Sequence, residues 1–183
     1  MEENTGRKGF RERFFNKKAL LIVAVLVIVG GTGVGVFMVK ASHNPAFCTA
    51  CHIMEPYYES YNDSNLLANK HAQAGLVCHD CHEPSITTQA EEGIKYITGN
   101  YQTPLEKRSF SKKFCLECHE NNEEVKFENV KEKTDFDESN PHDSHNGELE
   151  CNTCHSMHQQ SQVMCTQCHL FVWTTELDDS WAK

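Results

Sequence analysis

The sequence predicts a mainly α-helical protein with extensive loops, in which a single N-terminal transmembrane helix precedes a domain outside the membrane. Three observations predict this fold class. Residues 19–39 form a run of 21 uncharged residues. All ten cysteines belong to five copies of the motif C-x-x-C-H, spread between residues 48 and 169. Beyond residue 41, no alternation of apolar and polar residues persists long enough to predict β-strands.

Residues 1–18 form a basic segment that we expect in the cytoplasm. They contain six basic residues against three glutamates, a balance of +3. Positive charge beside a membrane helix favours the cytoplasmic side, so the rest of the chain is expected on the extracytoplasmic face of the cell membrane. The basic residues are Arg7, Lys8, Arg11, Arg13, Lys17 and Lys18.

Residues 19–40 are predicted to form the transmembrane anchor. At about 1.5 Å per residue, 21 residues span a hydrocarbon layer of about 30 Å. A cleaved signal peptide is the alternative, with Val39 and Ala41 flanking the cleavage site, but its apolar part is usually only about 7 to 15 residues long. Gly31 and Gly35 have the small-xxx-small spacing of packed membrane helices, which allows a homo-oligomer.

The five C-x-x-C-H motifs are typical of covalent haem attachment. Thiols at positions i and i+3 share one side of a helical turn, so both reach the vinyl-derived edges of one porphyrin. The histidine that follows binds iron through a neutral imidazole nitrogen. Disulfides or zinc also use paired cysteines, but neither explains a histidine after every pair. The sequence thus predicts five covalently bound haem c groups, on Cys48, Cys51, Cys78, Cys81, Cys115, Cys118, Cys151, Cys154, Cys165 and Cys168, with His52, His82, His119, His155 and His169 as ligands.

The exported part is poor in aliphatic runs and strongly acidic. A domain of this size would have a thin apolar core without the faces of its haems, so we expect little fold in their absence. From residue 41 onward, 10 Lys and Arg oppose 23 Asp and Glu, a formal charge of −13. This charge argues against a nucleic-acid partner. It is concentrated in residues 117–150, which form either a solvated linker or a docking face for a basic protein.

Residues 85–101 contain a helical pattern without a haem motif. Ile86, Ala90, Ile94 and Ile97 recur at helical spacing, and charged residues occupy the other faces. The apolar face either packs on haem or lies along the membrane surface, where a lipid-soluble substrate arrives.

Six histidines do not follow a C-x-x-C pair. We expect four of them to be distal iron ligands: His71, His142, His145 and His158. His79 lies inside a motif, and His43 lies near the membrane exit, so neither is counted. Four distal histidines serve five haems, which leaves the first haem without one.

The first motif, "CTACHIM", offers an alternative ligand to its own histidine. Residues two apart do not share a helix face, so His52 and Met54 do not both address one side of the haem on a regular helix. Either His52 binds iron and Met54 is packing, or Met54 displaces it. Methionine ligation would raise the potential of this haem above that of bis-histidine sites.

The segments "FCTACHIMEPYYESY", "HAQAGLVCHDCHEP" and "GIKYITGNYQTP" resemble the NapC/NirT/NrfH family of membrane-anchored multihaem quinol dehydrogenases. The resemblance implies oxidation of menaquinol or ubiquinol at the first haem, with Met54 as its axial ligand. It also implies a quinol site that contains a lysine and an acidic residue after the second haem. Lys95 with Glu91 or Glu92 are the nearest matches.

The segment "HDSHNGELECNTCHSMHQQSQVMCTQCH" is similar to the haem domain of tetrahaem flavocytochrome c fumarate reductases. This resemblance implies distal roles for His142, His145 and His158. Together the two resemblances imply a NapC-like module with haems 1 and 2 over residues 41–110, and a flavocytochrome-like module with haems 3 to 5 over residues 111–183. The chain departs from both resemblances. The flavocytochrome haem domains have four sites where this region offers three, and the quinol dehydrogenase family usually has four where this chain has five.

We therefore expect an electron-transfer protein with quinol dehydrogenase activity. It would pass electrons from menaquinol to an exported reductase, which the second resemblance implies is a flavoprotein, in anaerobic respiration. A passive relay that never contacts quinol is an alternative. A terminal multihaem reductase is a further alternative, but its mark would be a C-x-x-C-K site, and all five motifs end in histidine.

Overall fold

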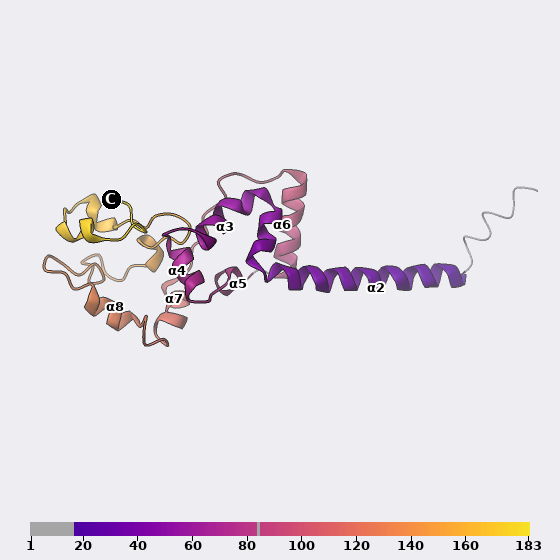
Figure 1. The fold of residues 1–183 in the computed structure, drawn as a ribbon, viewed down its shortest axis with the longest axis horizontal. Coiled ribbons are helices and arrows are strands. Elements are labelled where there is room, and N and C mark those ends of the chain that lie inside the picture. The colour runs from indigo at the N-terminus through magenta and orange to yellow at the C-terminus, as the bar shows by residue number, and fades with distance from the viewer. Residues whose placement is uncertain (1–16, 84) are drawn as a thin grey trace, which may run out of the picture. The chain divides into compact units, whose positions relative to one another are not determined.

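The computed structural model describes residues 17–83 and 85–183 (Figure 1). The chain divides into two compact units, Met1–Phe47 and Cys48–Lys183. Most of the predicted cytoplasmic segment, residues 1–16, lies outside the described residues.

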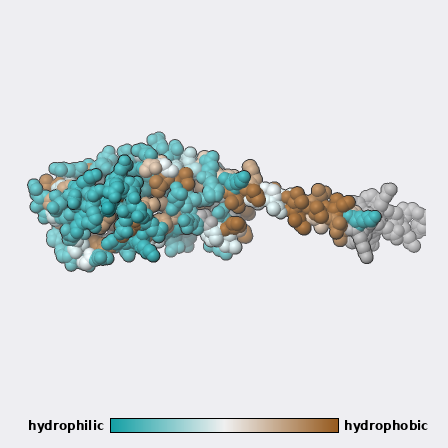
Figure 2. Space-filling model, turned by 90° about the horizontal axis from the view of Figure 1, so that it is seen from below, coloured by the Kyte–Doolittle hydropathy of each residue, from teal (hydrophilic) through white to brown (hydrophobic). Residues whose placement is uncertain are grey.

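The first unit contains one long helix, α2, which runs over Lys17–Ser42. Within the described part of the chain it is the one helix long and apolar enough to cross a membrane. Its apolar side chains are exposed on all sides, and Figure 2 shows them as a continuous hydrophobic surface. The helical bonds satisfy its backbone, as a hydrocarbon layer requires. A long apolar helix is thus confirmed where the membrane anchor was predicted, and α2 extends the predicted range by two residues at each end.

The second unit consists of short helices joined by loops. Its α-helices are α3 (Glu55–Asn62), α4 (Leu67–Gln73), α5 (Cys78–Cys81), α6 (Ile86–Thr98), α7 (Lys112–His119) and α8 (Phe127–Lys133). Five 3₁₀ turns cover η1 (Pro45–Ala50, which begins before the unit boundary), η2 (His52–Met54), η3 (Cys151–Thr153), η4 (Met164–Gln167) and η5 (Val172–Glu176). Over residues 17–83 and 85–183 no strand is present, only an isolated bridge between Ser161 and Trp181. The expected fold class is confirmed.

Helix α6 coincides with the predicted amphipathic segment. The Ser85 hydroxyl caps its first turn by accepting a hydrogen bond from the Thr88 amide at 3.1 Å. Gly99 ends the helix in the left-handed conformation, with φ of 71°, which costs glycine little. The apolar side chains remain outside: Ile86, Ile94 and Ile97 are 70%, 61% and 84% exposed.

Helices α3 and α4 pack side by side and connect to the C-terminal part of the chain (Figure 1). Within the pair, the Asn69 side chain donates to the Tyr61 carbonyl at 2.8 Å. The Ala68 amide of α4 donates to the carbonyl of Met157 at 3.0 Å. The Lys70 ammonium of α4 contacts the Asp178 carboxylate at 2.6 Å. Helix α4 therefore contacts segments that lie about 90 and 108 residues further along the chain.

The protein's own core is small. Among the described residues, three hydrophobic side chains are buried: Ala68, Val163 and Trp173. Ser161 and Ser180 are fully buried, and their backbones pair where the Ser161 amide donates to the Ser180 carbonyl at 2.8 Å. On the face shown in Figure 2, the surface of the second unit consists mainly of hydrophilic residues. The few buried apolar side chains agree with the thin protein core expected from the sequence.

Candidate haem sites

Four of the five C-x-x-C-H motifs close one turn of backbone. The amides of His82, His155 and His169 donate to the carbonyl of the first cysteine of their own motif at 2.8 to 2.9 Å. His119 ends α7, which contains its whole motif. In each case the turn brings the two thiols and the imidazole together, which is the arrangement that covalent haem needs.

The first motif has a different backbone. The Cys51 residue is extended, with φ of −100° and ψ of 109°, and a new 3₁₀ turn begins at His52. The Met54 amide donates to the Cys51 carbonyl at 2.8 Å, whereas no bond from His52 to Cys48 occurs in the described part of the chain. His52 is exposed and Met54 is half-buried. The structure therefore separates the first motif from the other four.

The four other motif histidines each face one further histidine. The ring centroids are 6.2 Å apart for His82 and His158, 6.2 Å for His119 and His71, 6.3 Å for His155 and His142, and 5.9 Å for His169 and His145. Metal–imidazole bonds are about 2.0–2.1 Å long, so two imidazoles on opposite sides of one iron have centroids about 6 Å apart. All four predicted distal histidines lie at such a distance from a motif histidine.

Two of the distal histidines are held by a hydroxyl group. The Ser60 hydroxyl lies 2.7 Å from His158 Nδ1, and it donates its proton to the Tyr57 carbonyl. The Thr134 hydroxyl lies 2.8 Å from His142 Nδ1 and donates to the Val130 carbonyl. With its proton directed at that carbonyl, each hydroxyl can accept a hydrogen bond from Nδ1–H. The lone pair of each imidazole is then on Nε2.

The other two distal histidines are held by carbonyl oxygens. His71 Nδ1 donates to the Leu67 carbonyl at 2.8 Å, and His145 Nδ1 donates to the side-chain oxygen of Asn146 at 3.2 Å. A carbonyl oxygen accepts only, so the proton is again on Nδ1. Metal-bound histidines use this arrangement, in which an outer hydrogen bond fixes the tautomer and the ring orientation.

Burial keeps several of these imidazoles neutral. It lowers the pKa of His155 to about 4, with smaller contributions from His142 and His119. Burial is also the largest cause that lowers the pKa of His82, His142 and His158. A histidine must be neutral to bind a metal, so these sites are prepared for ligation at pH 7.

The cysteine side chains of consecutive motifs lie close to one another. A hydrogen bond with the Cys78 side chain lowers the pKa of the Cys48 thiol to about 7, and the same bond raises the pKa of Cys78. Burial, followed by the charge of Cys151 and a hydrogen bond with it, raises the pKa of Cys115 to about 11. Weaker electrostatic interactions join Cys81 to Cys118 and Cys154 to Cys165. The five motifs thus follow one another in space in the order of the sequence.

These residues fit covalently bound haem c. Paired thiols are available for thioether bonds, and neutral imidazoles that face a second imidazole ring are available for iron. When bound, haem supplies one-electron transfer, and the protein tunes its potential through axial ligands, outer hydrogen bonds and burial.

Comparison with known proteins agrees with this assignment. The sequence profile of the NapC/NirT cytochrome c family, N-terminal region, matches residues 11–102, half of the chain. The chain belongs to this family. The profile of cytochrome c3 matches residues 70–170, so the NapC/NirT chain also carries a cytochrome c3 domain. It is therefore a membrane-anchored c-type multihaem cytochrome that functions in electron transfer.

Three curated relatives support both resemblances. The chain is 34% identical to cytochrome c-type protein Cgr1 of Eggerthella lenta, over 81% of the chain and 79% of Cgr1. It is 30% identical to cytochrome c-type protein TorC of Escherichia coli, over 46% of the chain and 22% of TorC. It is 35% identical to the probable fumarate reductase Ifc3 of Shewanella frigidimarina, over 31% of the chain and 8% of Ifc3. No solved structure matches the chain.

The residues predicted for quinol binding lie on α6 of this NapC/NirT chain. Glu92 forms an ion pair with Arg108 at 2.5 Å, and the charges of both residues influence His82 of the second motif. Glu91 and Lys95 are exposed. Within the described residues, no hydrogen bond or ion pair joins Lys95 to His52 or Met54. The structure thus brings Glu92 towards the second motif.

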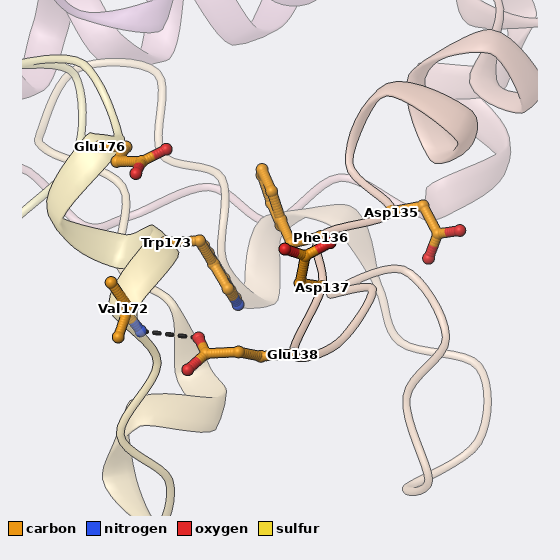
Figure 3. A pocket seen from close by; sticks show the side chains of 7 residues that line it. All are labelled: Asp135, Phe136, Asp137, Glu138, Val172, Trp173 and Glu176. Atoms are coloured by element: carbon orange, nitrogen blue, oxygen red, sulfur yellow. Dashed lines mark hydrogen bonds between the residues drawn. The ribbon is translucent and has the colours of Figure 1, made fainter.

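An acid-lined pocket of about 500 Å³ lies in the C-terminal half of the NapC/NirT chain (Figure 3). Its aromatic wall is the stacked pair Phe136 and Trp173, with centroids 4.8 Å apart. Beside this pair, the Glu138 carboxylate accepts a hydrogen bond from the Val172 amide at 2.7 Å, which joins two segments that line the pocket. The stack continues from Trp173 to Phe171 and from Phe171 to His169 of the fifth motif. The pocket is lined by Asp135, Phe136, Asp137, Glu138, Val172, Trp173 and Glu176.

No sequence motif identifies the residues that support the predicted ligands. Ser60 and Thr134 are single hydroxyls without a motif, and Ser60 is 98 residues from His158. Trp181 meets His155 edge to face at 5.1 Å, and Phe110 meets His82 at 5.7 Å. Thr134 is the exception, because it lies only eight residues before His142 of the "HDSH" pair.

Proposed function

We propose that this chain is a pentahaem c-type cytochrome that oxidises menaquinol and transfers electrons to an extracytoplasmic reductase in anaerobic respiration. Its haem domain lies on the extracytoplasmic face of the cell membrane, since the basic segment precedes α2. The reductase contains flavin, as the resemblance of the C-terminal segment to flavocytochrome c fumarate reductases implies. All five motifs carry haem, because each supplies two thiols and a histidine.

The departure of the first motif from the other four carries this proposal. Its histidine is exposed and belongs to none of the four imidazole pairs. The half-buried Met54 binds iron in its place, which gives this site a higher potential than the bis-histidine sites. A site without a distal histidine has room for a substrate, and five residues separate this motif from the end of the membrane helix.

The residues of α6 have the chemistry to bind quinol. Menaquinol loses two protons and two electrons when it becomes menaquinone. Lys95 and Glu91 are exposed on α6. The Lys95 ammonium donates a hydrogen bond to a quinol oxygen, and the Glu91 carboxylate accepts the two protons in turn and releases each to solvent. Glu92 supports this site while Arg108 holds its carboxylate. The exposed isoleucines of the same helix provide the apolar surface that a lipid-soluble ring prefers.

The electrons then follow the order of the motifs. The contacts of Cys48 with Cys78 and of Cys115 with Cys151 support close approach of neighbouring haem edges. The fifth motif ends the series, so the reductase receives electrons there. The negative charge of the exported part favours a partner with a basic docking face.

The test is anaerobic reduction of the purified, oxidised protein by a menaquinol analogue, followed at the α-band of reduced c-type haem. We expect rapid reduction, and a loss of at least about tenfold in rate in Lys95→Ala and Met54→Ala, as expected when a positioned acid–base group or ligand is removed. Gln102→Ala, an exposed change outside α6, is the matched control.

Reduction by dithionite separates the outcomes of this test. Full reduction by dithionite without reduction by quinol would reject quinol oxidation and favour the passive relay. Equal quinol rates in the wild type and in both variants would reject the site on α6 and Met54.

A further inference from the structure

The histidine of the fourth motif has an aromatic neighbour where the histidine of the third motif has a hydrogen-bonded oxygen. His119 Nδ1 lies 2.9 Å from the Val125 carbonyl. Over residues 17–83 and 85–183, no hydrogen bond reaches a ring nitrogen of His155. Its ring instead meets the indole of Trp181 edge to face, with centroids 5.1 Å apart and planes 68° apart. Since an outer hydrogen bond usually fixes the ring of a metal-bound histidine, the fourth motif depends on a different contact.

The backbone is held on both sides of His155. The Gln162 amide donates to the Cys154 carbonyl at 2.9 Å. The Ser156 amide donates to the Ser161 hydroxyl at 3.1 Å. This histidine therefore has a fixed place relative to the segment that carries both bonding partners.

The same segment fixes the C-terminal residues. The Ser161 amide donates to the Ser180 carbonyl, and the Ala182 amide donates to the Ser161 carbonyl, both at 2.8 Å. Trp181 lies between these two bonds, and the Gln160 side chain donates to its carbonyl at 3.2 Å. A short series of hydrogen bonds thus sets the position of Trp181 relative to the fourth motif.

Helix α4 restrains the C-terminal residues from a second direction. The Lys70 ammonium donates to the Asp178 carboxylate at 2.6 Å and to the Ser180 hydroxyl at 3.2 Å. Ser180 is fully buried, so the residue before Trp181 is enclosed by the fold. The indole is therefore placed against His155 by contacts from two separate parts of the chain.

We propose that Trp181 is a positioning residue of the fourth haem site, where its indole fixes the ring plane of His155 and keeps water away from that imidazole. This role rests on haem at the fourth motif, as in the proposed function, but it does not depend on quinol oxidation. Trp181 is not an iron ligand, and it acts on the haem through His155.

Two effects of the indole change the potential of the fourth haem in the same direction. Ferric haem carries one more positive charge than ferrous haem, and a dry, apolar surrounding disfavours the state with more charge. Water beside His155 would accept a hydrogen bond from the imidazole and make it a stronger donor to ferric iron. Because the indole excludes this water, Trp181 raises the midpoint potential.

The experiment is spectropotentiometry of the full-length, haem-loaded protein, with electron paramagnetic resonance of its oxidised form. Trp181→Ala is expected to lower one of the five midpoint potentials and to leave the other four unchanged. It should also move the g values of one low-spin signal, because these depend on the angle between the two imidazole planes of a haem. Trp181→Phe keeps an aromatic ring and should retain most of the wild-type potential. Tyr101→Ala, which removes an aromatic side chain that stacks on Tyr96, is the control.

A second substitution identifies the haem that responds. Thr134 bonds His142, whose ring faces His155 at 6.3 Å with planes 8° apart. In the double variant Thr134→Val/Trp181→Ala, both substitutions should act on one midpoint potential. Changes in two different potentials would reject the fourth site as the target of Trp181.

Trp181→Leu keeps the proposal testable if Trp181→Ala does not accumulate. Leucine retains an apolar side chain but has no ring, so we expect moved g values and a smaller decrease in potential. Aromatic packing without a role at the haem would stabilise the fold and leave both readouts unchanged. Unchanged potentials and g values in Trp181→Ala, or unchanged g values in Trp181→Leu, would overturn the proposal. A decrease in potential that is equal in Trp181→Phe and Trp181→Ala would do the same. None of these measurements uses quinol, so a failure of quinol oxidation leaves this test intact.

Discussion

The four predicted distal histidines share one local arrangement, in which Nδ1 lies within hydrogen-bonding distance of an oxygen and the ring faces a second imidazole. The oxygen is a hydroxyl for His142 and His158 and a carbonyl for His71 and His145. Such an outer hydrogen bond increases the basicity of the ligand and fixes the plane of the ring. These oxygens therefore adjust the potential of each site as well as its geometry.

Thr134→Val should raise the midpoint potential of one haem. Valine keeps the shape of threonine but removes the acceptor for His142 Nδ1–H, so His142 becomes a weaker donor to iron. The unpaired N–H should also lower the free energy of unfolding by about 1–3 kcal/mol. Spectropotentiometry measures the potential, and denaturant unfolding measures the stability.

The control is Thr175→Val, which removes an exposed hydroxyl that donates only to the Val172 carbonyl. An unchanged set of midpoint potentials in Thr134→Val would show that Thr134 does not act on an iron ligand.

Residue counting singled out four histidines as distal ligands, a role that stays a prediction, but it did not predict the side chains that support them. Eleven histidines minus the five that follow C-x-x-C pairs left six, and the positions of His79 and His43 reduced these to four. Serine and threonine are common, and the bond of Ser60 to His158 forms only after the chain has folded across 98 residues. The pairing of ligands depends on the same long-range folding, so the sequence alone did not predict it.

At the scale of elements, the amphipathic helix and the membrane helix were the most predictable features. Both have a strong local pattern, periodic apolar residues in α6 and an unbroken apolar run in α2, and each pattern acts without tertiary contacts. The 3₁₀ turns of the fourth and fifth motifs have no such pattern. Their conformation follows from closing the C-x-x-C-H turn.

Ile97→Glu on α6 should reduce the rate of quinol reduction. Ile97 is 84% exposed, and burying such a side chain against lipid or a quinol ring contributes about 1.5–3 kcal/mol, roughly a tenfold or larger change in affinity. The measurement is the dependence of the reduction rate on quinol concentration, in lipid vesicles. Gln102→Glu adds the same charge outside α6 and should have little effect. Equal curves for the two variants would mean that the apolar face of α6 does not meet quinol or lipid.

The ion pair between Lys70 of α4 and Asp178 of the C-terminal segment should weaken in acid. The hydrogen bond from Lys70, followed by that from Ser180, lowers the pKa of Asp178 to about 2. A carboxylate with a lowered pKa stabilises the fold above its unfolded pKa, about 4, and loses that contribution as the pH falls towards 2. Both side chains are largely exposed, so solvent limits the effect to about 1 kcal/mol or less.

Asp178→Asn tests this contribution. It should lower the free energy of unfolding at pH 7 by that amount and flatten the acid limb of the stability curve between about pH 4 and pH 2. Asp179→Asn changes the neighbouring exposed carboxylate and should leave the curve unchanged. Identical acid limbs in the wild type and Asp178→Asn would contradict the role of the pair.

At the scale of the whole molecule, the two family matches overlap and do not abut. The NapC/NirT profile ends at residue 102, whereas the cytochrome c3 profile begins at residue 70, so α4, α5 and α6 are within or next to both. The predicted boundary at residue 110 remains a prediction, and the contacts of α4 with Met157 and Asp178 cross it. The two family matches therefore do not correspond to two independently folded parts of the chain.

The second unit, Cys48–Lys183, should fold only when haem is attached. Its three buried hydrophobic side chains release about 1.5–3 kcal/mol each at most on burial, whereas ordering each residue costs about 1–2 kcal/mol of backbone entropy. Haem faces add apolar area, and each iron joins two distant histidines, as His82 and His158 are joined. Production of the full-length chain with and without the cytochrome c maturation system, followed by limited proteolysis of membranes, measures this dependence. Without haem, we expect cleavage throughout residues 48–183 and protection of α2, whose backbone bonds are internal and whose side chains suit lipid. A protease-resistant unit without haem would mean that the protein core alone is sufficient to fold it.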